Sequence, residues 1–171
     1  MTIKVVAHPA KLAWRNFKPV AVVPDSDEDA QVAPEATLPG RVGMQKVKGK
    51  FRLADFTVTV APKSSDTVIV RTANKTADLL EHEQGHYELM ILSARAMAAE
   101  LEKLEADSAE ELQSAVTDVQ SAHASRADAV DHEYDRQTDH SRNVAQQRRW
   151  RKLIDQAMAS GNASSIDGND L

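Results

Sequence analysis

The chain shows two patterns of apolar and polar residues, which meet near residue 75. Before that point, short β-branched runs bounded by turn residues predict strands. A longer run, 51–60, ends in apolar residues that alternate with threonines, which predicts a half-buried strand. Residues 24–40 are acidic and rich in proline, so they predict an exposed loop. The β-branched runs are 3–7, 19–23 and 67–70.

After residue 75, apolar residues recur at spacings of three and four, which predicts long helices. A second helical pattern begins near Ser108, and no proline follows to break it. The pattern therefore predicts two long helices over 74–160, joined by a short turn near Asp107 into an antiparallel hairpin. Residues 161–171 contain glycine and serine and predict a flexible tail.

The two patterns together predict one domain over residues 1–171, of the α+β class. A small antiparallel sheet from residues 1–73, which are mainly β with the acidic loop, would pack on the helical hairpin. A chain of 171 residues can bury its own core. Aromatic residues make up only 4%, which suits closely packed helices better than a large aromatic-rich sandwich.

Charge and composition exclude several classes of function. The net charge is −5 at pH 7, and no dominant basic face is available for phosphates, so we expect no nucleic-acid partner. The chain has no cysteine, so any metal must be held by His, Asp or Glu. The first residues lack an apolar run of the length that a signal peptide or membrane span requires, so the protein as written is expected to start in the cytoplasm.

The sequence HEQGH, residues 82–86, is an HExxH motif. On a helix, His82 and His86 share one face, so both imidazoles can hold one tetrahedral ion. Glu83 projects about 100° away from His82. From there it can act as general base towards a zinc-activated water that attacks a carbonyl. The motif predicts a Zn²⁺ site and a metallopeptidase.

Spacing leaves the third metal ligand open. In the predicted hairpin His82 lies opposite roughly residue 133, and His86 lies opposite roughly residue 129. This arrangement brings residues 131–140 towards the histidines. The segment supplies four candidate ligands: Asp131, His132, Asp135 and His140.

The direction of His140 depends on where the helix ends. In an unbroken helix, His140 would point about 140° around the axis from Asp135. Both can serve one site only if the helix ends or kinks between about Thr138 and Asn143.

Gly85 stands between the two histidines, although glycine in a helix costs about 1 kcal/mol relative to alanine. We expect a neighbouring backbone, the second helix or a strand, to approach closely there. The strand FTVTVAP, residues 56–62, is expected beside the cleft, where it could hold an extended peptide by strand addition.

Three segments in order, LLEHEQGHYEL, EYDRQTDHS and QQRRW, resemble an uncharacterised bacterial family described as secreted zinc-dependent proteases. The resemblance implies a zincin-like fold with Glu83 as general base. It also implies that Tyr134 stabilises the oxyanion and that Asp135 orients a ligand imidazole. The implied zinc ligands are His82, His86 and His140.

The chain departs from the pattern of that family at two positions. Tyr87 stands where phenylalanine is usual, and Ser141 stands where glycine is expected. The resemblance also implies a periplasmic or secreted protein, which would require an export signal that has been removed.

The leading expectation is a zinc-dependent metallopeptidase that acts on a peptide or protein. Two alternatives stay open. One is a zinc hydrolase that acts on a cell-wall amide. The other is a non-catalytic, metal-stabilised module whose basic helix, 142–152, binds a partner.

Overall fold

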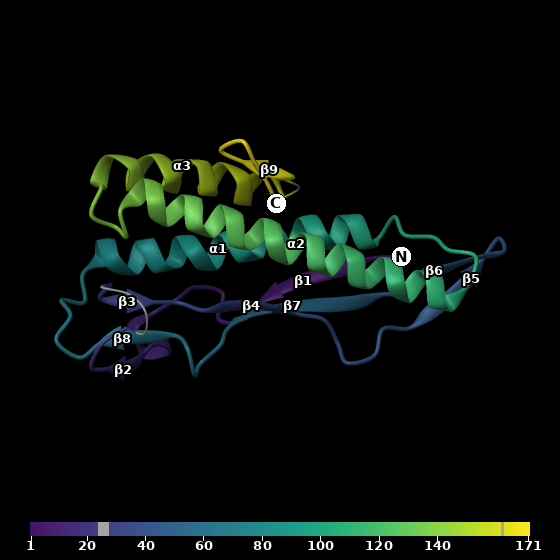
Figure 1. The fold of residues 1–171 in the computed structure, drawn as a ribbon, viewed down its shortest axis with the longest axis horizontal. Helices are drawn as coiled ribbons and strands as arrows, with labels where there is room; N and C mark the ends of the chain where they lie inside the picture. Colours follow the sequence, from purple (N-terminus) through teal and green to yellow (C-terminus); the bar gives the residue numbers. More distant parts are fainter. Residues whose placement is uncertain (24–27, 162) are drawn as a thin grey trace.

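The computed structural model describes residues 1–23, 28–161 and 163–171 and confirms the α+β class. Figure 1 shows the strands of the N-terminal half on one side of α1 and α2, with α3 and the C-terminal strand β9 on the other side of these two helices. The helices are α1 (Ala77–Leu101), α2 (Ala109–Thr138) and α3 (Val144–Ser160). The strands are β1 (Ile3–Ala7), β2 (Lys18–Val20), β3 (Ala30–Gln31), β4 (Pro34–Thr37), β5 (Met44–Val47), β6 (Lys50–Leu53), β7 (Phe56–Pro62), β8 (Val68–Val70), β9 (Ser165–Ile166) and β10 (Asn169–Asp170).

The sheets mix parallel and antiparallel pairs, so the expectation of an antiparallel sheet was wrong. The main sheet has the order β1–β7–β4, with β1 parallel and β4 antiparallel to β7. A second sheet, β2–β8–β3, repeats this mixture, and β5 pairs with β6 as an antiparallel hairpin. Alternation along a strand shows which face is buried but says nothing about the direction of its neighbours.

Strand β7, which contains FTVTVAP, is the central strand of the main sheet. Both of its edges are paired, one with β1 and one with β4. The expected addition of a peptide strand to residues 56–62 is therefore excluded. An added strand needs an unpaired edge, and in this sheet β4 and β1 are the edge strands.

The acidic segment 24–40, expected as an exposed loop, contains two strands. Residues 24–27 lie outside the described residues, and the remainder includes β3 and β4. Buried Ala30 and Val32 alternate with exposed Gln31, which is a strand pattern. The flanking acidic residues and prolines hid this short alternation in the sequence.

The described part of the expected flexible tail is an antiparallel hairpin of β9 and β10. Ile166 and Leu171 are buried against α3 and the neighbouring helices. Arg149 of α3 forms an ion pair with Asp167 in the turn of this hairpin. The tail is ordered because its two apolar residues extend the core beneath α3.

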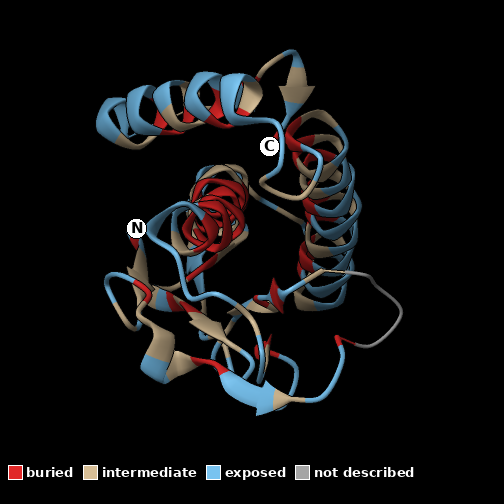
Figure 2. Ribbon diagram, turned by 90° about the vertical axis from the view of Figure 1, so that its left-hand side faces the viewer, coloured by how far each residue is buried: buried red, intermediate tan, exposed pale blue. Residues whose placement is uncertain are grey.

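Helix α1 starts where its sequence predicts, but it ends at Leu101, before the turn expected near Asp107. The Thr76 side chain accepts a hydrogen bond from the backbone N–H of Leu79, which caps the start. Ser108 and Glu111 form a reciprocal capping box at the start of α2. Figure 2 shows α1 buried between the sheet, α2 and α3. The two motif histidines of α1 are therefore buried inside the protein. No described helix is long and apolar enough to cross a bilayer.

The second helix of the expected hairpin is broken into α2 and α3, which corrects the prediction of two helices over 74–160. Helix α2 ends at Thr138, and the next three residues have positive φ: 48° at Asp139, 49° at His140 and 75° at Ser141. Asn143 then caps α3. Each left-handed residue other than glycine costs roughly 1–2 kcal/mol. Neither glycine nor proline marks this turn in the sequence.

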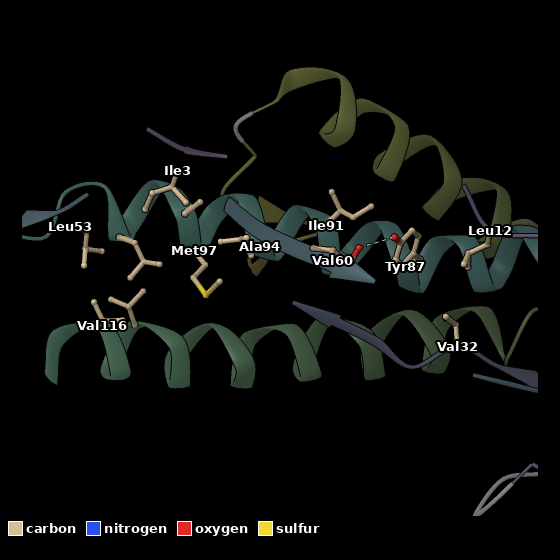
Figure 3. Close-up of a cluster of buried hydrophobic side chains, with 14 of the residues drawn as sticks. Ile3, Leu12, Val32, Leu53, Val60, Tyr87, Ile91, Ala94, Met97 and Val116 are labelled. Atoms are coloured by element: carbon tan, nitrogen blue, oxygen red, sulfur yellow. Dashed lines mark hydrogen bonds between the residues drawn. The ribbon is translucent and has the colours of Figure 1, made fainter. Parts of the chain in front are cut away.

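Tyr87 ties α1 to the sheet from within the main apolar core (Figure 3). Its hydroxyl faces two backbone carbonyls, Pro9 O at 2.9 Å and Val60 O at 3.0 Å.

We expect Tyr87→Phe to lower the free energy of unfolding by about 1 kcal/mol, because a buried hydrogen bond is lost while the ring still fills its place. Urea denaturation measures this change. The midpoint should fall while the slope of the unfolding free energy against urea concentration stays the same, and an unchanged midpoint would contradict the prediction.

Candidate metal centre

His82 and His86 of α1 aim their Nε2 atoms at one point. The two atoms lie 3.1 Å apart, and both side chains are buried, with 3% and 7% of their surface exposed. The rings meet edge to face, with an interplanar angle of 89°. The structure therefore brings the two motif histidines together on one face, as their spacing predicted.

Asp135 of α2 supplies a third donor atom at the same point. Its Oδ1 lies 3.1 Å from His82 Nε2 and 2.9 Å from His86 Nε2. Donor atoms around a tetrahedral zinc ion, with bonds of roughly 2.0–2.1 Å, are about 3.3 Å apart. The Asp135 oxygen is buried and makes no hydrogen bond of good geometry among the described residues. The three atoms fit one ion.

Partners on the far side of each imidazole fix its orientation. His82 Nδ1 lies 3.1 Å from Gln147 Oε1, and His86 Nδ1 lies 2.5 Å from Asp131 Oδ1. With the proton on Nδ1, each ring donates to its partner and leaves the Nε2 lone pair for a metal. Asp131, a candidate ligand in the sequence, thus lies behind His86. Gln147 was missed as a site residue, although the resembling segment QQRRW contains it.

His140 lies beside this group in the turn after α2. Its Nδ1 is 3.5 Å from Asp135 Oδ1 and contacts the carboxylate of Glu28. The helix end that His140 needed is present, but its nitrogen joins a second group of donors with Glu28 and Asp135. The geometry favours Asp135 as the third ligand of the first group, and the role of His140 as zinc ligand stays a prediction. His132 is exposed and donates to Asp128 O, away from the site.

Ionisation at the site follows from burial and from the neighbouring carboxylates. Burial lowers the pKa of His82. Burial also acts to lower the pKa of His86, but the Asp131 and Asp135 carboxylates outweigh it and raise that pKa. Burial alone would raise the pKa of Asp135, yet the two imidazoles hold it below its usual range. Asp135 is therefore an anion at neutral pH and offers a charged oxygen to a cation.

Glu83, the expected general base, is buried beside the histidines, with 2% of its surface exposed. Its Oε2 accepts a hydrogen bond of 2.7 Å from the backbone N–H of Val32. Burial raises its pKa to about 7, against the lowering effects of His86 and the Val32 N–H. Glu83 also lines a cavity of about 80 Å³ together with His82 and His140. A carboxyl with this pKa can accept and release a proton near neutral pH.

Tyr134 packs beneath the imidazoles. Its ring stacks on His82 at 4.9 Å between centroids, and only 1% of its surface is exposed. The hydroxyl donates to the His82 carbonyl at 3.2 Å and accepts from Gln147 Nε2 at 3.0 Å. Burial raises its pKa to about 12. Its hydroxyl is engaged within the protein, so its oxyanion role stays a prediction.

Gly85 lies against the Tyr134 ring. A Cβ at residue 85 would lie 2.7 Å from Tyr134 Cζ and 3.0 Å from Cε1, and closer still to Oη. The expected close approach is present, but a side chain makes it rather than a neighbouring backbone. The absence of a Cβ lets Tyr134 reach the His82 ring.

Comparisons with known proteins give a family and no activity. A family model described as "Bacterial protein of unknown function (DUF922)" matches residues 46–141, which include the HExxH motif and the segment 131–140. Searches of the curated proteins and of the solved structures found no match. The match agrees with the expectation of an uncharacterised bacterial family. Because it covers more than half of the chain, this protein belongs to the DUF922 family.

Proposed function

We propose that the protein is a zinc-dependent hydrolase that cleaves peptide bonds. One observation carries the proposal: His82 Nε2, His86 Nε2 and Asp135 Oδ1 lie 2.9–3.1 Å from one another beside the buried carboxylate of Glu83. Three protein donors leave a fourth tetrahedral position open, as catalytic zinc sites do. A zincin-like architecture is part of this proposal.

The residues around the donors would divide the work. A zinc ion in this position would polarise a carbonyl and make a water more acidic. Glu83 would accept the proton of the attacking water and pass it to the leaving amine. The Val32 N–H donates to one oxygen of Glu83 and so restricts the position of the carboxylate. Asp131 and Gln147 would keep the two imidazoles in the tautomer that binds metal.

A groove along strand β4 supports a peptide as the substrate. Its volume is about 350 Å³, and β4, α1 and α2 line it. Met90 and Asp128 line it one helical turn from His86 and Asp131, respectively. Ala33 O accepts a hydrogen bond from Lys63 N on the β7 side, so alternation turns the N–H and C=O of Ala36 towards the open edge. An extended peptide can pair with such an edge.

A second function has one observation in its favour. The cavity at Glu83 is only about 80 Å³, which suits an ion with a few waters rather than a bound peptide. This size favours a non-catalytic module whose metal stabilises the fold. A hydrolase that acts on a cell-wall amide shares the chemistry of the leading proposal and differs from it only in substrate.

The test of the proposed function is a peptide-library digestion by the zinc-loaded protein. We expect cleavage that a chelator abolishes and that added zinc restores. A cell-wall peptide in the same assay distinguishes the two proposed hydrolases. Cleavage of this peptide alone would indicate an enzyme that acts on a cell-wall amide. Zinc binding that raises the melting temperature without any cleavage would instead establish the structural module.

Removal of one imidazole should abolish tight zinc binding. We expect His86→Ala to lower zinc affinity at least about 100-fold, because one metal donor is lost together with the contact by which Asp131 orients it. Competition with a chromophoric chelator measures the affinity. His132→Ala is the matched control, since His132 is exposed and outside the donor group. Equal affinities in the parent and His86→Ala would refute the proposed centre.

A further inference from the structure

A second group of donor atoms adjoins the proposed zinc centre. We propose that Glu28, Asp135 and His140 form a second divalent-cation site, with the Asp135 carboxylate bridging the two ions. This inference rests on the proposed function, because Asp135 also belongs to the first group. It adds a metal ion that the HExxH motif does not imply.

The donor atoms of this second group converge from three segments of the chain. The donor atoms of Glu28, Asp135 and His140 all lie within 4.8 Å of one another. His140 directs a single nitrogen, Nδ1, towards both carboxylates, at 3.5 Å from Asp135 Oδ1 and in contact with Glu28. A shared carboxylate between neighbouring ions is compatible with the separation of roughly 3.5–4 Å found in two-metal hydrolases.

Backbone strain places His140 in this group. His140 has a φ of 49° and lies between two other residues with positive φ, Asp139 and Ser141. Its backbone N–H still bonds to the Asp135 carbonyl at 3.4 Å, which keeps the turn close to the end of α2. Strained backbone conformations cluster at functional sites. Here the strained turn of three residues sets the position of the His140 imidazole.

Space and charge between the two donor groups suit a cation. Glu28 and His140 line the same cavity of about 80 Å³ as His82 and Glu83, which is enough for an ion with a few waters. Three acidic side chains line it, Glu28, Asp29 and Glu83, against one arginine, Arg142. Arg142 is half exposed and lies 3.9 Å from Asp139. A single divalent ion bound by His82, His86 and Asp135 would leave more negative than positive charge around this cavity.

An ion pair between His140 and the two carboxylates explains fewer of these observations than a bound metal ion does. Both His140 Nδ1 and Asp135 Oδ1 are buried atoms without a hydrogen bond of good geometry among the described residues. Buried polar atoms are normally hydrogen-bonded, and a cation between the Asp135 oxygen and the His140 nitrogen would be a common partner for both. The oxygen and the imidazole nitrogen are both ligand atoms that zinc accepts.

The test is the number of metal ions bound per chain. The protein is stripped with a chelator, titrated with Zn²⁺, separated from free metal and analysed for zinc. We expect two equivalents in the parent and one equivalent in both Glu28→Ala and His140→Ala. The matched controls Glu35→Ala and His132→Ala, which change exposed residues outside both groups, should keep two equivalents. In the parent loaded with Mn²⁺, electron paramagnetic resonance should show two coupled ions.

The outcomes separate the two proposals. One equivalent in the parent and in Glu28→Ala, with an uncoupled Mn²⁺ signal, would overturn the second site and leave the first intact. One equivalent in the parent and none in His140→Ala would assign His140 to the first ion and also overturn the second site. No bound metal in the folded parent would refute the proposed function itself. The Mn²⁺ measurement uses the parent, so it decides the matter even if a variant fails to fold.

Discussion

Glu83→Gln is expected to bind zinc like the parent and to lose about 10²–10⁴-fold in kcat, the usual contribution of a general base. Glutamine has the shape of glutamate and can still accept the hydrogen bond from the Val32 N–H, so the fold and the donor group should be unchanged. The amide has no basic oxygen for the proton of the attacking water. The loss should therefore appear in kcat, with little change in KM.

Two measurements decide this prediction. Zinc content and kcat are determined for the parent, for Glu83→Gln and for Glu81→Gln, which makes the same change at an exposed position of α1. Full zinc in all three proteins with a loss of kcat in Glu83→Gln alone supports the assigned base. Equal activity of the parent and Glu83→Gln would rule out Glu83 as the base and would point to a contaminating protease.

The helices and the motif pairing followed from the sequence because their signals are local. Capping residues and apolar spacing place the starts of α1 and α2, at Thr76 and Ser108. The predicted antiparallel hairpin, with its turn near Asp107, placed His82 opposite roughly residue 133. The structure pairs His82 with Asp135, two residues further along. In a tight antiparallel hairpin, an error of this size is less than one helical turn.

The sheet could not be predicted in the same way, because its pairings join distant segments. β1 and β7 are parallel and are separated by nearly fifty residues, and nothing in either strand specifies the other. The same limit applies to Glu28. Glu28 contacts His140 and lies two residues before β3, which pairs with the distant β8, and an acidic residue in a proline-rich stretch carries no local sign of that pairing.

The end of α2 shows how a local rule fails at a candidate site. Helix propensity and the absence of proline favour a continuous helix through residue 140, yet Asp139, His140 and Ser141 adopt positive φ. The stop comes directly after Thr138, which is fully buried and whose hydroxyl donates to the Tyr134 carbonyl, one turn earlier in the same helix, at 2.7 Å. Sequence reasoning identified that His140 needs this stop but could not show that the stop exists.

Gly85→Ala is expected to destabilise the protein by about 1–3 kcal/mol, the usual cost of overpacking a core. At an ordinary exposed helical position the same substitution would stabilise by about 1 kcal/mol, so the sign itself is diagnostic. The added Cβ would lie 2.7 Å from Tyr134 Cζ, so the ring must move. Because Tyr134 stacks on His82 and shares Gln147 with it, zinc affinity should fall as well.

Urea denaturation and zinc titration of a double-mutant cycle test this origin of the effect. In the Tyr134→Ala background the ring is absent, so we expect the added methyl group at residue 85 to cost nothing or to stabilise. Gly40→Ala is the matched control, because a Cβ there meets no atom within 4 Å. A Gly85→Ala penalty that persists without Tyr134 would place the clash elsewhere. A stabilised Gly85→Ala with parental zinc affinity would show that the glycine does not position the histidine pair.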